Sequence, residues 1–116
     1  METITLYNQA EDLLESAQEE MMRPEEDIVP YLVCQKCFYA ISHYLKGYLK
    51  HQDINYSTEA ELTELLDLAL QSNDQFKAIN RTFLKQPADT EDVWMNIDRA
   101  RDFIELTKKT RYMVGL

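Results

Sequence analysis

The sequence predicts an all-α protein, an up-and-down bundle of four to five helices that forms a single domain over residues 1–116. Apolar residues recur at steps of three and four along almost the whole chain, which is the repeat of an amphipathic helix. No window alternates with a period of two over the length of a strand. Only 2 Gly and 3 Pro occur, too few for the many turns of a β-sandwich or barrel.

The first two helices are predicted over residues 6–21 and from Pro30 to about Lys50. Pro24 and the acidic residues 25–27 separate them, and Pro30 suits the first turn of a helix because it lacks the amide hydrogen that would be unpaired there. Apolar side chains cover more than one face of the second helix, so we expect it to be the central, most buried one. Gly47 within it predicts the close approach of a neighbouring backbone.

Three further helices are predicted in the second half of the chain. Thr58 and Glu61 match a capping box at the start of the third helix, whose leucines lie between residues 62 and 70. A shorter fourth helix is expected over residues 76–84, closed by Pro87. Thr90 is the predicted cap of a fifth helix, which should run to about Arg111.

Charge is distributed unevenly along the chain, whose net charge is −9 at pH 7. Acidic residues dominate residues 1–30, whereas basic residues dominate residues 99–116. The two helices could attract each other or form two solvated faces, and the alternative is a small anion-binding or nucleic-acid patch on the last helix. The negative net charge disfavours nucleic acid. The sequence contains no segment apolar enough for a signal peptide or a membrane span, so we expect a cytoplasmic protein.

Cys34 and Cys37 form a CxxC motif that we interpret as two small buried apolar residues. A redox pair would need a preceding strand and a helix N-terminus. A zinc site would need four convergent ligands, but His43 and His51 project from other faces of the helix. A thiol or metal sensor remains an alternative, and we expect no metal and no cofactor.

No catalytic set can be assembled from the residue pattern. Two glycines cannot make a phosphate-binding loop. Ser42 and His43 are adjacent, and adjacent residues on a helix do not face each other. Tyr44 and Tyr48, one turn apart, are expected to stack as core or interface residues. They could alternatively form a stacking platform for a base beside Lys46 and Lys50.

The segment CFYAISHYLKGYL, residues 37–49, resembles the central helix of HEPN domains (higher eukaryotes and prokaryotes nucleotide-binding). The leucines at the start of the third helix and the pair Arg111 and Tyr112 near the end of the last also suit that family. The positions of the segment that match the family pattern are Cys37, Ala40, Ile41, Leu45, Lys46, Tyr48 and Leu49.

The resemblance implies a HEPN-like bundle that is commonly homodimeric and is sometimes paired with a small nucleotidyltransferase. Catalytic members cleave RNA with an arginine followed four to six residues later by a histidine, but no histidine follows any arginine of this chain at that spacing. The family's Glu-Lys pair is also replaced by Ser42 and His43. The RNase chemistry is therefore not transferred to this chain.

We expect a non-catalytic binding or interaction protein, and a homodimer because one bundle cannot cover all the apolar surface of the second helix. A nucleotide or a nucleotidyltransferase is the expected partner. The alternative is an RNA-processing or nucleotide-modifying enzyme of a toxin–antitoxin type that uses His43, Lys46 and the basic last helix. Candidate ligand-binding residues are Tyr44, Lys46, Tyr48, Lys50, Arg111 and Tyr112.

Overall fold

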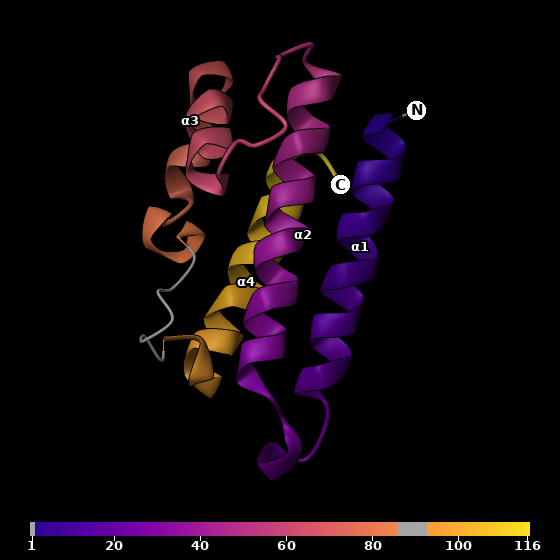
Figure 1. The fold of residues 1–116 in the computed structure, drawn as a ribbon, viewed down its shortest axis with the longest axis vertical. Helices are drawn as coiled ribbons and strands as arrows, with labels where there is room; N and C mark the ends of the chain where they lie inside the picture. Colours follow the sequence, from indigo (N-terminus) through magenta and orange to yellow (C-terminus); the bar gives the residue numbers. More distant parts are fainter. Residues whose placement is uncertain (1, 86–92) are drawn as a thin grey trace.

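A computed structural model describes residues 2–85 and 93–116, and within these ranges it contains helices and no strand (Figure 1). The four α-helices are α1 (Glu2–Met21), α2 (Pro30–His51), α3 (Leu62–Ser72) and α4 (Ile97–Met113). Short 3₁₀ turns occupy parts of the connections. The predicted all-α bundle is confirmed.

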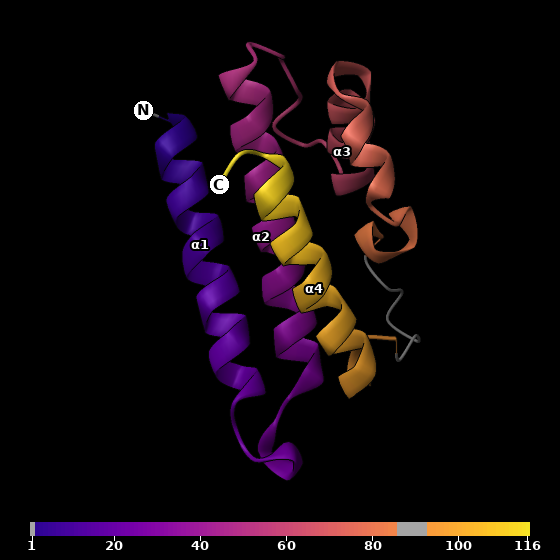
Figure 2. The ribbon, with the colours of Figure 1, turned by 180° about the vertical axis from the view of Figure 1, so that it is seen from behind.

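Helix α2 lies at the centre of the bundle. Helices α1 and α3 lie on opposite sides of it, and α4 packs across the face of α2 that Figure 2 shows (Figure 1, Figure 2). Helices α1 and α2 are antiparallel, whereas α4 runs in the same direction as α2 (Figure 2). Ten of the 22 residues of α2 are buried, against three of 20 in α1. The prediction that this helix is the most buried one is confirmed, because its neighbours cover most of its circumference.

The starts of α2 and α4 carry a proline and an asparagine that stabilise the first turn, and only the proline was predicted. Pro30 occupies the first turn of α2, where its missing amide hydrogen has no intrahelical partner to lose. Asn96 caps α4, and its side-chain oxygen accepts hydrogen bonds from the backbone amides of Asp98 at 2.7 Å and Arg99 at 3.2 Å. This cap was not predicted. The sequence predicts an apolar stripe of Val93, Trp94, Ile97, Ala100, Ile104 and Leu106 for this helix and misses Phe103, which is fully buried.

The predicted capping box at the start of the third helix is wrong. Helix α3 begins at Leu62, and its flanking residue Glu61 makes no side-chain capping bond. Ser57 instead holds a turn, because its hydroxyl accepts a hydrogen bond from the amide of Glu59 and its carbonyl accepts one from the amide of Ala60. This turn directs the chain into α3 at Leu62, three residues later than a capping box at Thr58 and Glu61 would.

The predicted fourth α-helix is also wrong, since residues 74–84 form two 3₁₀ turns, Asp74–Ala78 and Arg81–Leu84. Asn73 and Asn80 each accept a hydrogen bond on the side-chain oxygen from the amide two residues ahead. Such local bonds compete with a continuous helix. The expected apolar residues of this segment still reach the core, where Phe76, Ile79 and Leu84 are buried.

The predicted fifth helix is divided. A 3₁₀ turn, Val93–Met95, precedes α4 and places Trp94 in the core, whereas Val93 is exposed. Pro87 and Thr90, the predicted stop and cap, lie outside the described residues.

Gly47 allows α1 and α2 to pack closely, but the neighbour is a side chain and not the backbone expected from the sequence. A Cβ atom placed on Gly47 would lie 2.5 Å from Cε1 of Tyr7. Only glycine leaves room for that ring. Tyr7 joins a small cluster of the buried residues Ala10, Ala40 and Tyr44, which forms the contact between the two helices.

Candidate functional site

The six residues predicted to bind a ligand do not form one site. Tyr44 and Arg111 come together, but on a carboxylate of the protein itself. The Tyr44 hydroxyl donates a 2.5 Å hydrogen bond to Glu11 Oε1, and Arg111 Nε donates one of 2.6 Å to the same oxygen. These three residues, which we call the Glu11 cluster, join α1, α2 and α4.

The negative charge of Glu11 is compensated within the Glu11 cluster by the hydrogen bonds from Arg111 and Tyr44. Partial burial acts to raise the pKa of the Glu11 carboxyl, but hydrogen bonds from Arg111 and Tyr44 outweigh it and hold that pKa below its usual range. Burial, reinforced by the Glu11 carboxylate, raises the pKa of the Tyr44 hydroxyl. Each group is thus fixed in the protonation state that bonds its neighbours. The cluster is also the point where the acidic first helix and the basic last helix attract each other, one of the alternatives that the charge distribution suggested.

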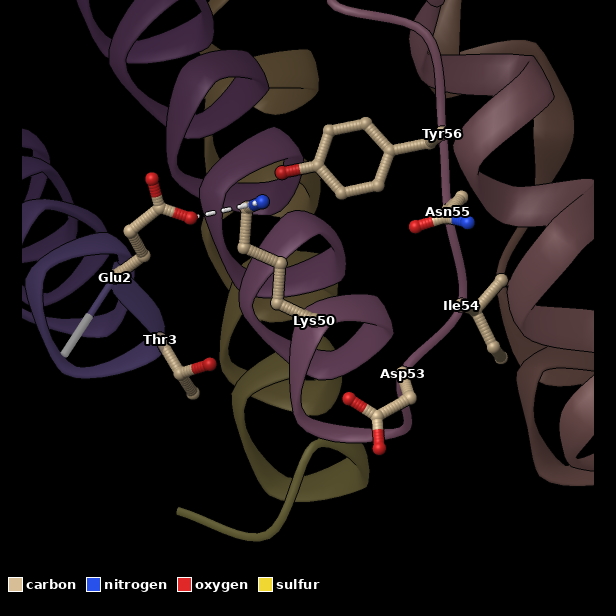
Figure 3. Close-up of a pocket in the computed structure, with 7 residues that line it drawn as sticks. All are labelled: Glu2, Thr3, Lys50, Asp53, Ile54, Asn55 and Tyr56. Carbon is tan, nitrogen blue, oxygen red and sulfur yellow. Dashed lines mark ion pairs between the residues drawn. The ribbon is translucent and has the colours of Figure 1, made fainter.

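Lys50 belongs to a second location, a shallow pocket at the end of α2 (Figure 3). Its ammonium lies 2.9 Å from the carboxylate of Glu2 and 5.3 Å from the centre of the Tyr56 ring. The hydrogen bond from Lys50 lowers the pKa of the Glu2 carboxyl, which is fully exposed. The aromatic neighbour of this cation is Tyr56 of the following loop, and not Tyr44 or Tyr48. The pair ties the start of α1 to the end of α2.

Tyr48 and Tyr112 lie in contrasting environments. Tyr48 is buried in the core, where its ring lies 4.9 Å from that of Phe76 and its hydroxyl bonds Ser72 across 2.9 Å. It therefore contributes to packing between α2 and the second half of the chain, and Tyr44 packs in the separate α1 contact. Tyr112 is 78% exposed near the end of α4.

Lys46 lines a pocket that has a volume of about 760 Å³ and lies between α2 and the residues that lead into α3. We call it the α2–α3 pocket. Its polar lining comprises Ser42, His43 and Lys46 of α2, Glu59, Glu61 and Thr63 at the approach to α3, and Lys85. Phe38 and Tyr39 supply aromatic surface, and their rings meet edge to face at 5.6 Å. The volume lies within the range of about 300–1,000 Å³ found for small-molecule pockets.

His43 is neutral in this pocket near neutral pH. Burial, with a smaller contribution from the charge of Lys46, lowers the pKa of its imidazole. Its Nδ1 is buried and has no hydrogen-bond partner in the described part of the chain. Both ring nitrogens of a protonated His43 would carry a hydrogen. The N–H at Nδ1 would have no acceptor in the described part of the chain, and the charge of Lys46 would oppose the positive ring, so the neutral ring is favoured. His43 is thus half-buried and lines a pocket.

The two cysteines are buried in the main core. Burial raises the pKa of both thiols to about 12. A thiol with so little thiolate at neutral pH is a poor nucleophile and a poor metal ligand. Within residues 2–85 and 93–116, no group of three or more His, Cys, Asp or Glu side chains is arranged to hold a metal ion.

Two of the five basic side chains of α4 pair with carboxylates of the same helix. Arg101 pairs with Asp98 at 3.2 Å and Lys108 pairs with Glu105 at 3.5 Å. These ion pairs neutralise part of the positive charge that a nucleic-acid patch would need. None of the described helices is long and apolar enough to cross a membrane.

Several residues of these sites were missed by reasoning from the sequence. Glu11 is not among the candidate residues of the sequence analysis, and only the position of α4 shows that it faces Arg111. Glu59 and Glu61 approach His43 because the turn at Ser57 brings residues 59–63 back towards α2. No spacing rule connects residues so distant in sequence. The one available signal was Gly47, which indicated that another part of the chain lies against α2.

The fold is a small helical bundle built around one central helix. A family model described as the HEPN domain matches residues 4–110, so the chain belongs to the HEPN domain family, a family of nucleotide-binding and RNase-type domains. No curated protein and no solved structure was found to match the chain.

Proposed function

We propose that this chain is a non-catalytic HEPN domain that acts by binding, and that it works as a homodimer. The observation that carries this proposal is the separation of its reactive groups. Arg111 is bound to Glu11 on the α1 side of α2, whereas His43 lies beside Lys46 in the α2–α3 pocket. A general base and an arginine that work on one phosphate must converge on it.

The surface that supports a homodimer lies beside this pocket. Most apolar residues of α2 are already covered inside the bundle, but its Tyr31 and Tyr39 remain 40% and 42% exposed. Val93 and Met95, in the turn before α4, are 42% and 59% exposed. The ring of Trp94 lies 5.4 Å from that of Tyr31 and 5.6 Å from that of Phe38, whose other aromatic neighbour is Tyr39. Trp94 therefore joins the exposed tyrosines of α2 to the turn that contains Val93 and Met95. We call this surface the aromatic face.

Charge favours a second copy of the chain as the occupant of the aromatic face. Its exposed members Tyr31, Tyr39, Val93 and Met95 are all uncharged, so two copies can meet there without bringing like charges together. The outer surface of α1 carries Asp12, Glu15 and Glu19, all exposed, and would repel its own copy. Burial of exposed aromatic side chains supplies the apolar core that stable interfaces need.

The test is the oligomeric state of the purified protein by light scattering at micromolar concentration. We expect the wild type to be a dimer and Tyr39→Glu to be a monomer. Ile4→Glu is the matched control, because Ile4 is 61% exposed on α1, outside the aromatic face. This control should remain a dimer. A monomeric wild type, or equal disruption by both variants, would contradict the proposal.

The resemblance implies two partners for such a domain, a nucleotide and a small nucleotidyltransferase. The enzyme alternative has one observation in its favour, since His43 and Lys46 share a pocket. Incubation of the pure protein with RNA and with nucleoside triphosphates tests it. We expect no turnover, and RNA cleavage or nucleotidyl transfer that is lost in His43→Ala would replace the binding proposal by the enzymatic one.

A further inference from the structure

The α2–α3 pocket combines a fixed charge pattern with aromatic surface. Two ammonium groups line it, those of Lys46 and Lys85, and neither forms an ion pair with any residue in the described part of the chain. Two carboxylates, Glu59 and Glu61, line the same pocket. Because His43 is neutral there, the charged side chains of the lining sum to zero.

This balance discriminates between classes of ligand. A ligand with one negative charge can bind Lys46 while the carboxylates stay solvated at the exposed approach to α3. A di- or triphosphate brings several negative charges towards Glu59 and Glu61, and like charges at close range are unfavourable. The pocket therefore suits a singly charged anion better than a polyphosphate or a nucleic-acid backbone.

The aromatic side of the pocket specifies the rest of the ligand. Phe38 is half-buried and held by its contacts with Tyr39 and Trp94, so its ring is a fixed surface. Aromatic ligands gain from offset or edge-to-face contact with such rings. Lys46, one helical turn beyond Ser42 on the same side of α2, supplies the positive charge at the polar end.

We propose that the α2–α3 pocket binds a small aromatic carboxylate, whose carboxylate pairs with Lys46 and whose ring packs on Phe38. This inference rests on the proposed binding role and names the chemical class that the domain takes. The neutral ring of His43 borders the ligand without adding charge, which preserves the preference for a single negative charge.

Titration with phenylacetate, followed by backbone amide chemical shifts, tests the inference. We expect shifts confined to the lining of the pocket and weaker binding of phenylacetamide, which has the same ring and no charge. Lys46→Met should weaken phenylacetate binding about tenfold, as expected for loss of a charged hydrogen-bond partner. Lys77→Met is the matched control, an exposed lysine outside the pocket, and should leave binding unchanged.

Three outcomes would overturn the inference: no binding of phenylacetate, equal binding of phenylacetamide, or an equal effect of the two lysine variants. Tighter binding of adenosine monophosphate or triphosphate would do the same, because it would show that the carboxylates do not exclude phosphates. Light scattering of the same samples separates this inference from the proposed function. A dimer that binds no aromatic acid contradicts only the ligand assignment.

Discussion

Polar side chains on the two sides of α2 differ in whether other parts of the chain bind them. On the α1 side, Tyr44 and Arg111 are engaged with Glu11, and the Tyr7 ring fills the space left by Gly47. On the α3 side, His43 has an unpaired nitrogen, and Lys46 makes no ion pair in the part of the chain that the structure describes. Polar groups that satisfy one another contribute to stability, whereas unpaired groups in a pocket are available to a ligand.

The largest expected effect tests the close packing on the α1 side. Gly47→Leu should destabilise the protein by about 2 kcal/mol, because the new side chain must displace the Tyr7 ring in a packed contact. Denaturation by urea measures the change. Ser42→Leu on the pocket side is the control and should change stability by less than about 0.5 kcal/mol.

The loss of stability caused by Gly47→Leu should be smaller when the Tyr7 ring is absent. In a Tyr7→Ala background, Gly47→Leu should cost much less than in the wild type, since the two positions are coupled. An undiminished cost in that background would show that Tyr7 is not what requires a glycine.

A smaller effect tests the Glu11 cluster. Glu11→Gln should cost about 1 kcal/mol at neutral pH, a modest value because the side chains of Glu11 and Arg111 are each about 40% exposed. The folded-state pKa of Glu11 lies below its usual value, so its contribution is present above the unfolded-state pKa and is lost as the pH falls through the folded-state pKa. The difference between wild type and variant should therefore vanish in acid.

Urea denaturation of both proteins over the acid range provides the measurement. Glu15→Gln is the control, an exposed residue of the same helix, and should match the wild type throughout. A gap between wild type and Glu11→Gln that stays constant down to strongly acidic pH would show that the Glu11 charge does not act through this cluster.

The smallest effect belongs to the pocket side. Lys46→Met should change stability by less than about 0.5 kcal/mol, since no ion pair with a described residue is lost. It should also raise the pKa of His43 slightly, because the ammonium of Lys46 opposes protonation while burial remains. NMR titration of the imidazole measures this shift. A loss of stability as large as that of Glu11→Gln would remove the contrast between the two sides.

Local patterns of the sequence predicted much of the fold. The spacing of Val33, Cys37 and Ile41 identified a central helix, and Pro30 identified its start. The errors occurred where side chains compete with the backbone. Asn73 and Asn80 turned a predicted helix into two 3₁₀ turns, and Ser57 replaced a predicted capping box. Both alternatives use the same residue types, and small free-energy differences decide between them.

The candidate sites were less predictable than the helices. The six candidate ligand-binding residues were chosen from the sequence as one group, but the structure distributes them among the core, two pockets, the Glu11 cluster and the surface. Lys46 is the one that lines the α2–α3 pocket. Its neighbours Glu59 and Glu61 could not be assigned from spacing, because a loop of ten residues, 52–61, separates α2 from α3.

By itself, the sequence determined the helical class, the central position of α2 and most of the apolar residues that form the core, because these follow from periodicity within one segment. Only the tertiary structure decided which polar side chains meet. Glu11 and Arg111 are 100 residues apart, and only the packing of α1 and α4 against one helix brings them together. The same packing leaves His43 and Lys46 facing a pocket, since a side chain acquires its environment from the elements that surround it.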